Sequence, residues 1–89
     1  MTFYIEYGSL SLTCAWRVDG TLVVRCKRRL HHAEGLHVRM GDTLIIKDQR
    51  GRERWICGVR SFHPHVQYGR FTHSGTVVCS YVIKSSLYS

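Results

Sequence analysis

The sequence has little acid, a single proline and no closely spaced cysteine pair. Only six of its 89 residues are Asp or Glu, and no C-x-x-C motif occurs among its four cysteines. Three aspartates fall at expected turns and Glu53 is expected to face Lys47, so no carboxylate pair is left for acid–base catalysis. No serine or cysteine lies in a motif that marks an activated nucleophile. These absences favour a binding protein over an enzyme.

The cysteines and histidines lack the spacing of a metal site. Each cysteine lies inside an expected strand, whereas zinc knuckles place their ligands on loops, and we interpret all four as small, reduced core residues. They are Cys14, Cys26, Cys57 and Cys79. Three histidines around the proline could approach one another on an extended backbone, but histidines in loops are usually solvated. These are His63, His65 and His73. We predict no metal and no cofactor.

Long hydrophobic runs, linkers and repeats are also missing. A membrane-spanning helix needs about 20 consecutive apolar residues, and the segment after Met1 lacks the pattern of a signal peptide. The apolar content of 44%, with charges interspersed, is typical of a globular protein. We expect one domain over residues 1–89, located in the cytosol, or in the nucleus if the host is eukaryotic.

Positive charge is abundant. Thirteen Lys and Arg residues give a formal net charge of +7 at pH 7, with a pI near 9.7. On a small domain this charge raises the rate of encounter with polyanions, of which nucleic acid is the commonest in the cytosol. Small soluble proteins can also be basic for solubility alone, so the charge by itself leaves both interpretations open.

Two-residue alternation of apolar and polar residues runs through most of the chain and predicts β-strands. It covers 2–7, 10–18, 22–27 and 77–84, and a helix would scatter the apolar positions around its circumference. Between the second and third strands, a three-residue loop ending in a left-handed Gly20 makes the apolar faces agree. This loop places Trp16 opposite Leu22, Cys14 opposite Val24 and Leu12 opposite Cys26.

The segment 41–62 is interpreted as a central β-hairpin around which the rest is arranged. Its turn, 48–51, ends in Gly51, which can take the left-handed position of a three-residue loop with a bulge. Counting outward from the turn, Lys47 faces Glu53, and the same register continues along the strands. It places Ile46 opposite Arg54, Ile45 opposite Trp55 and Leu44 opposite Ile56.

Two segments are predicted to be irregular. Residues 27–39 are the most basic stretch and must lie on the surface, as a connection with one helical turn near residues 32–34. Pro64 is expected to end the preceding strand, so that residues 61–76 form a loop that closes with a turn at 73–75. In the final strand, alternation places Val77, Cys79, Tyr81 and Ile83 on one face.

These elements predict an all-β, mainly antiparallel fold of about six to seven strands. A lone sheet of that length would leave apolar faces and strand edges exposed. We therefore expect a small single-domain barrel or a compact sandwich.

The runs LVVRCKRR, VRMGDTLIIKD, GRERWICGVRSF and CSYVIKSS resemble the ASCH and PUA-like small β-barrel group over roughly residues 20–85. In that group a strand ending in arginine leads to a Gly-Asp turn, a long hairpin and a closing hydrophobic strand. Gly20 and Arg25 fit the group's G-x-K-x-x-E-x-R pattern, whereas residues 21–24 contain neither its lysine nor its glutamate. Because most members bind RNA and a few hydrolyse modified nucleosides, the resemblance implies an RNA-binding module.

The leading functional hypothesis is a small basic module that binds RNA or single-stranded DNA. Phosphates would be held by Arg and Lys side chains, and bases would stack on an exposed aromatic such as Tyr68 or Phe71. The cations are Arg25, Lys27, Arg28, Arg29 and Arg39, together with Arg52, Arg54 and Arg70.

The alternative hypothesis is a protein-interaction module, such as a small regulator or inhibitor from a phage or mobile element. Its positive face would then dock an acidic protein partner, or an edge strand would pair with the partner. Under either hypothesis the protein would be a monomer or a homodimer that does not associate with membranes.

Overall fold

The computed structural model describes residues 1–30, 35–68 and 71–85, with only the backbone given for 66–68 and 71. These residues form six strands and no helix, so no described helix could span a membrane. The strands are β1 (Phe3–Tyr7), β2 (Leu10–Trp16), β3 (Leu22–Cys26), β4 (Thr43–Lys47), β5 (Glu53–Tyr68) and β6 (Phe71–Lys84).

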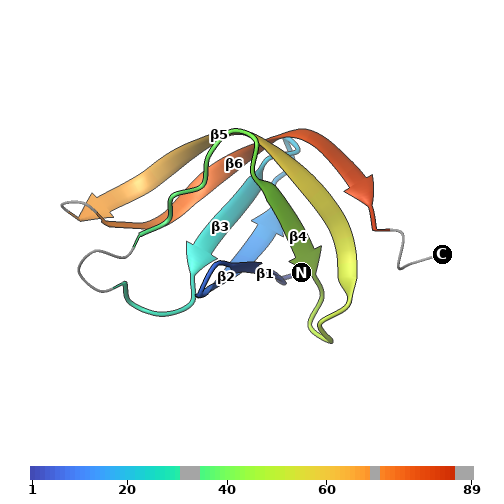
Figure 1. The fold of residues 1–89 in the computed structure, drawn as a ribbon, viewed down its shortest axis with the longest axis horizontal. Coiled ribbons are helices and arrows are strands. Elements are labelled where there is room, and N and C mark those ends of the chain that lie inside the picture. The colour runs from blue at the N-terminus through green and yellow to red at the C-terminus, as the bar shows by residue number, and fades with distance from the viewer. Residues whose placement is uncertain (31–34, 69–70, 86–89) are drawn as a thin grey trace.

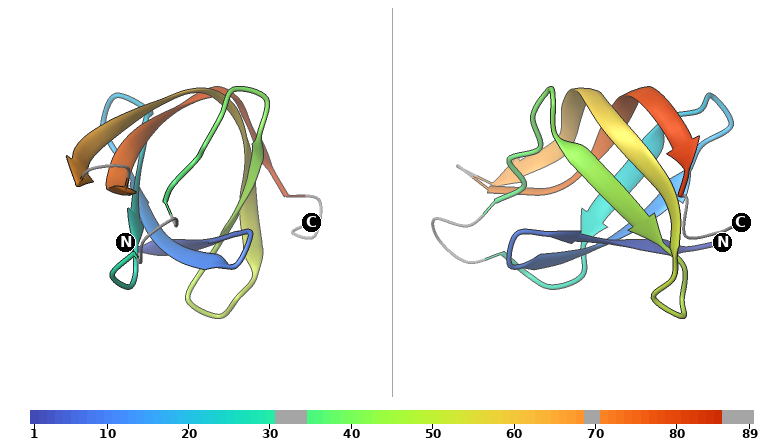
Figure 2. Two further views of the ribbon diagram at one scale, coloured as in Figure 1. Left: turned by 60° about the vertical axis from the view of Figure 1, so that its left-hand side comes forward. Right: turned by 45° about the vertical axis from the view of Figure 1, so that its right-hand side comes forward.

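The six strands close into an antiparallel barrel with the order β1-β2-β3-β6-β5-β4, in which β4 pairs back with β1. Two three-stranded meanders, β1–β3 and β4–β6, follow each other along the chain and are joined by the connection 27–42 (Figure 1). The strands enclose a single interior (Figure 2). The predicted all-β barrel is therefore confirmed, and closure protects most of the strand edges.

The first meander has the predicted register. Trp16 faces Leu22, and Cys14 faces Val24. Gly20 has a φ of 86°, and its N–H donates to the Arg17 carbonyl at 3.0 Å, which closes the expected three-residue loop. The alternation that predicted the strands thus also determines which side chains enter the core.

The β4–β5 hairpin has the predicted turn but a different register beyond it. Gly51 has a φ of 79° and Lys47 faces Glu53, as expected. A register shift follows immediately, so Ile46 faces Trp55 and Ile45 faces Ile56. The extra residue is Arg54, and a bulge of this kind reverses the faces of all later residues on the strand. As a result Trp55 packs against the core, and Ile45 lies outside.

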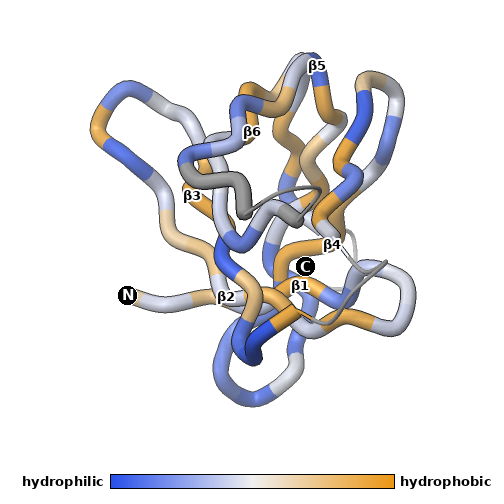
Figure 3. Tube along the Cα trace, turned by 90° about the vertical axis from the view of Figure 1, so that its left-hand side faces the viewer, coloured by the Kyte–Doolittle hydropathy of each residue, from blue (hydrophilic) through white to orange (hydrophobic). Residues whose placement is uncertain are grey.

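The barrel interior is filled from both ends. At one end Trp55 forms edge-to-face contacts with Phe3, at 4.9 Å between ring centroids, and with Trp16, at 6.3 Å. At the other end the connection 27–42 contributes three buried apolar side chains, although its basic composition predicted a surface segment. These are Leu30, Leu36 and Val38. Figure 3 shows hydrophobic and hydrophilic residues alternating along the strands.

The β5–β6 hairpin is much longer than predicted. Pro64 lies within β5 and does not end it, and Gly75 lies within β6 opposite Pro64 and does not form a turn. The pairing accommodates the proline because a register shift follows between Pro64 and Val66. The predicted loop at 61–76 and turn at 73–75 are therefore wrong. The predicted helical turn at 32–34 lies outside the described residues.

Two of the four cysteines are not reduced. Cys57 and Cys79 form a disulfide between β5 and β6, with their Cα atoms 5.6 Å apart. Val59 pairs with Cys79 and Gly58 with Tyr81, so the pairing skips one residue of β6. The skip turns Cys79 toward Cys57, and it moves Tyr81 to the outer surface, contrary to the prediction that both share a face.

The other two cysteines, Cys14 and Cys26, are buried and free, which confirms their predicted role as core residues. Burial raises the pKa of the Cys14 thiol to about 12, so this thiol stays protonated at neutral pH. A protonated thiol is a poor nucleophile.

Candidate functional site

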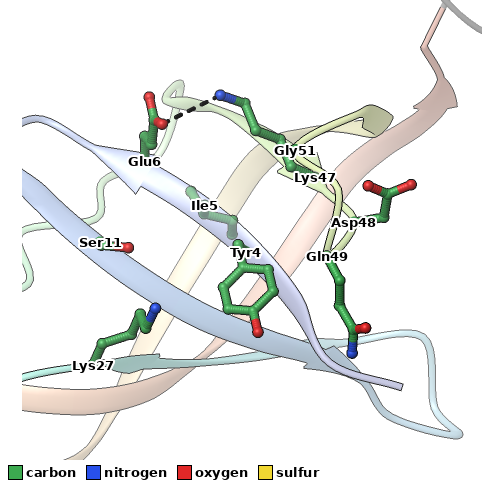
Figure 4. Close-up of a pocket in the computed structure, with 9 residues that line it drawn as sticks. All are labelled: Tyr4, Ile5, Glu6, Ser11, Lys27, Lys47, Asp48, Gln49 and Gly51. Atoms are coloured by element: carbon green, nitrogen blue, oxygen red, sulfur yellow. Dashed lines mark ion pairs between the residues drawn. The ribbon is translucent and has the colours of Figure 1, made fainter.

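A groove of about 380 Å³ lies on the outer surface of the barrel, along β1 (Figure 4). It extends from the end of β3 to the turn between β4 and β5, so that segments far apart in the sequence form its walls. Its volume is at the lower end of the range for small-ligand sites, roughly 300–1,000 Å³. The lining residues are Tyr4, Ile5, Glu6, Ser11, Lys27, Lys47, Asp48, Gln49 and Gly51.

Tyr4 is placed in the groove by strand parity. Its neighbours Phe3 and Ile5 are buried in the core, so the side chain between them must point outward. Tyr4 pairs with Thr13 on one side and with Lys47 on the other. The ring therefore stands on the outer wall, half-buried, with polar neighbours on both flanking strands.

Lys27 lies on the β3 side of the groove. Its backbone N–H donates to the Ser11 carbonyl at 3.2 Å, which extends the β2–β3 pairing by one residue. Its Nζ lies 5.0 Å from the centre of the Tyr4 ring, within the range of a cation–π interaction. The exposed ammonium group and the aromatic ring thus share one wall of the groove (Figure 4).

Lys47 lies on the opposite side, where its Nζ is 3.4 Å from Glu6 Oε1. The Lys47 side chain is 27% exposed and that of Glu6 is 77% exposed, so solvent screens this ion pair. Exposed pairs contribute little net stability, at most about 1 kcal/mol. An incoming anion can therefore compete with Glu6 for Lys47 at little cost.

Asp48 contributes little negative potential to the groove. Its Oδ1 accepts the N–H groups of Arg50 at 2.8 Å and Arg52 at 3.0 Å, and its Oδ2 lies 3.8 Å from Arg54 Nη1. Desolvation tends to raise the pKa of the Asp48 carboxyl, but the two N–H donors and the nearby guanidinium groups outweigh it, so the pKa lies below its usual value. The carboxylate is thus held within its own turn, and it points away from Tyr4 (Figure 4).

Lys27 and Lys47 line the groove on two sides. The β3 bank consists of Lys27 and its sequence neighbours Arg25, Arg28 and Arg29, all exposed. The turn bank, on the other side, consists of Lys47 together with Arg50 and Arg52, which flank the lining residue Gly51 in the turn. Tyr4 therefore lies between two lysines, each with arginines close to it in the sequence.

The structure brings together part of the predicted phosphate-binding set. Of the described members of that set only Lys27 lines the groove; Arg52 follows the lining residue Gly51, and Arg54, in β5, lies 3.8 Å from the lining residue Asp48. Arg39 lies apart from the groove lining, and its backbone N–H donates to Asp42 Oδ2 at 2.9 Å.

The predicted stacking aromatics lie elsewhere. Tyr68 and Phe71 face each other at the tip of the β5–β6 hairpin. This tip is at the opposite end of the molecule from the β4–β5 turn (Figures 1 and 2). The side chains of Tyr68 and Phe71, and all of Arg70, lie outside the described residues.

Sequence reasoning overlooked Tyr4 and assigned Lys47 to Glu53 alone. A signal for Tyr4 was present, because a tyrosine on the polar face of an alternating strand points into solvent. Lys47 does face Glu53 in the β-sheet register, but its ion pair is with Glu6 on β1. That partner depends on barrel closure, which local spacing does not reveal.

The histidines near Pro64 form separate polar contacts. His63 Nε2 lies 3.2 Å from Ser61 Oγ, and His65 Nε2 contacts Thr76 Oγ1. Among the described residues no cluster of three or more His, Cys, Asp or Glu side chains could hold a metal ion.

Comparison with known proteins identifies no relative of this chain. No protein-family model, no curated protein and no solved structure matches this chain. The resemblance to the ASCH and PUA-like group therefore stays a prediction.

Proposed function

We propose that this protein binds single-stranded nucleic acid, RNA or DNA, along the groove. A base stacks on Tyr4, and the phosphates on either side of it contact the β3 bank and the turn bank. The observation that carries the proposal is the Tyr4 ring on the outer wall, 5.0 Å from Lys27 Nζ and paired with Lys47 on the neighbouring strand.

The chemistry of the groove suits a single strand better than a duplex. Single-stranded nucleic acid offers both a flat base and a charged backbone, and an aromatic ring with neighbouring cations matches both. In a duplex the face of each base is covered by the neighbouring bases, so no base could stack on Tyr4. Among the described residues, the acidic groups that line the groove are Glu6, whose ion pair is screened, and Asp48, whose charge is compensated within its turn.

Long-range electrostatics supports the same partner. The net charge of +7 attracts polyanions from solution. Contacts to phosphates carry no sequence information, and stacking tolerates every base. We therefore expect modest sequence preference and strong dependence on salt.

The proposal is tested by measuring the affinity of labelled single-stranded U-rich RNA and T-rich DNA by fluorescence anisotropy. Tyr4→Leu should weaken binding by about five- to 150-fold, because loss of one stacked base costs about 1–3 kcal/mol, whereas Tyr4→Phe should bind nearly as wild type. Lys27→Ala should also weaken binding. Arg17→Ala, which removes an exposed cation of the β2–β3 turn outside the groove lining, is the matched control.

Two results would overturn the proposal. One is the absence of binding to either probe at low salt. The other is equal affinity of the wild type, Tyr4→Leu and Lys27→Ala, with thermal melts showing that all three are folded.

A further inference from the structure

Strand β6 extends well beyond the barrel wall. It pairs with β3 only from Ser74 to Val77, whereas it pairs with β5 as far as Lys84. Residues 78–84, here called the overhang, therefore have β5 on one side and no other described strand on the other. An open strand edge presents unpaired N–H and C=O groups that can pair with another strand.

The overhang exposes apolar side chains. Tyr81, Val82 and Ile83 are 49%, 43% and 52% exposed. On the outer face a lateral row runs from Ile45 through Ile56 to Ile83, because these residues are register partners on β4, β5 and β6. The apolar row thus ends at the open edge.

The overhang also lies in the longest uncharged stretch of the chain. No Lys, Arg, Asp or Glu occurs from 71 to 83. Two molecules of charge +7 repel each other, and a strand edge with no Lys or Arg before Lys84 contributes little to that repulsion. An acidic partner would find no Lys or Arg to pair with in the overhang before Lys84. The overhang therefore favours a partner surface that is apolar and uncharged.

We propose that the overhang pairs with the overhang of a second copy of this chain. Antiparallel pairing across a two-fold axis matches a strand edge to itself, so that the same surface serves on both copies. With the axis at Tyr81, each Lys84 faces Val78 of the second copy, and the two Lys84 side chains stay apart. The sheets join into one, and the isoleucine rows of both copies flank the junction.

The overhang is short, about 23 Å for seven extended residues. An interface of this length falls at the small end of the specific interfaces, below the standard of roughly 1,600 Å² in total. The dimer is therefore expected to be reversible, and its population should depend on protein concentration.

The test is the molar mass in solution, measured by sedimentation equilibrium over a wide concentration range on nuclease-treated protein in high salt. High salt removes bound nucleic acid but not apolar association. The wild type should rise from the 10.3 kDa of one chain toward twice that mass. Ile83→Lys should lower the association constant by more than about tenfold, because it places a charged group of each copy in an apolar junction.

Val18→Lys is the matched control. It introduces the same charge at a fully exposed valine in the β2–β3 turn, and it should dimerise like the wild type. Thermal melts establish that both variants are folded. A wild type that is monomeric at every concentration, one that forms species larger than two chains, or equal association of the two variants would overturn the proposal. Because nucleic acid is absent, these outcomes are independent of binding in the groove.

Discussion

The ring of Phe62 lies directly against Gly75 on the neighbouring strand. A Cβ at Gly75 would collide with that ring and would lie 2.9 Å from the His63 carbonyl oxygen. Because the carbonyl belongs to the paired backbone, it cannot move aside as a flexible side chain could. Gly75 is therefore required for strand packing, although in the sequence it resembles a turn residue.

Gly75→Ala should destabilise the protein by about 1–3 kcal/mol, the usual effect of overpacking. Thermal unfolding would show this as a lower Tm, by roughly 4–8 °C for each kcal/mol in a domain of this size. Phe62→Leu in the same background provides the control. If the ring causes the clash, the double variant should recover part of the loss, and strictly additive effects would contradict this explanation.

Reduction of the Cys57–Cys79 disulfide should lower the free energy of unfolding by about 3 kcal/mol, because the bond closes a loop with a sequence separation of 22. Urea denaturation with and without reductant measures the difference. The Cys57→Ala/Cys79→Ala variant should be equally destabilised and insensitive to reductant. Thiol alkylation of the unfolded, unreduced protein should label only Cys14 and Cys26, and labelling of four cysteines would refute the disulfide.

Tyr7→Phe should cost about 1 kcal/mol at neutral pH. The Tyr7 hydroxyl lies 2.6 Å from the His37 carbonyl oxygen and 2.9 Å from Asp42 Oδ2, so it ties β1 to the segment before β4. Burial, followed by the hydrogen bond to Asp42, raises the pKa of Tyr7 above its usual value near 10. The folded state therefore holds the phenol proton more tightly than the unfolded state.

This linkage predicts an alkaline pH dependence. The stability contributed by Tyr7 is fully present below pH 10 and is lost as the pH rises through the raised pKa. The difference in Tm between the wild type and Tyr7→Phe should therefore narrow above pH 10. Tyr4→Phe, which alters a phenol on the outer wall, is the control, and a difference that stays constant with pH would contradict the prediction.

Binding of single-stranded nucleic acid should weaken steeply with salt, because each neutralised phosphate releases counterions. Arg28→Ala and Arg29→Ala should each reduce the slope of log K against log salt by about one if the side chain contacts a phosphate. Arg17→Ala, which removes an exposed arginine from the β2–β3 turn, should leave the slope nearly unchanged. Equal slopes for all three variants would show that Arg28 and Arg29 of the β3 bank do not contact phosphates.

The fold class was predictable because its determinants are local. Alternation along β1, β2 and β3 decides which side chains enter the core, and Gly20 and Gly51 adopt the left-handed conformations that their turns require. Both features act within a few residues and depend little on the rest of the chain. The predicted register of the first meander is accordingly confirmed.

The predictions of structure that were wrong concern residues that follow a bulge and the segment around Pro64. One extra residue at Arg54 and a skipped residue between Cys79 and Tyr81 reversed the faces of everything beyond them. Pro64 and Gly75 usually interrupt strands, but here they are paired with each other inside one hairpin. Such exceptions depend on which residues the partner strand places opposite. The sequence of a single segment does not give that information.

The candidate site was predictable only in part. The cations of the β3 bank all fall within residues 25–29, so they lie near one another in any fold. Tyr4 and Lys47 are separated by 43 positions, and they became neighbours only because β1 and β4 close the barrel. The same closure provides the Glu6 partner of Lys47.

The amino-acid sequence by itself determined the all-β class, the glycine-ended turns and the excess of positive charge, because periodicity, backbone preference and composition are properties of short segments. Only the tertiary structure decided the disulfide, the outward-facing isoleucine row and the groove around Tyr4. Each of these depends on contacts between strands distant in the chain, and a shift of one residue in pairing changes which side chains meet.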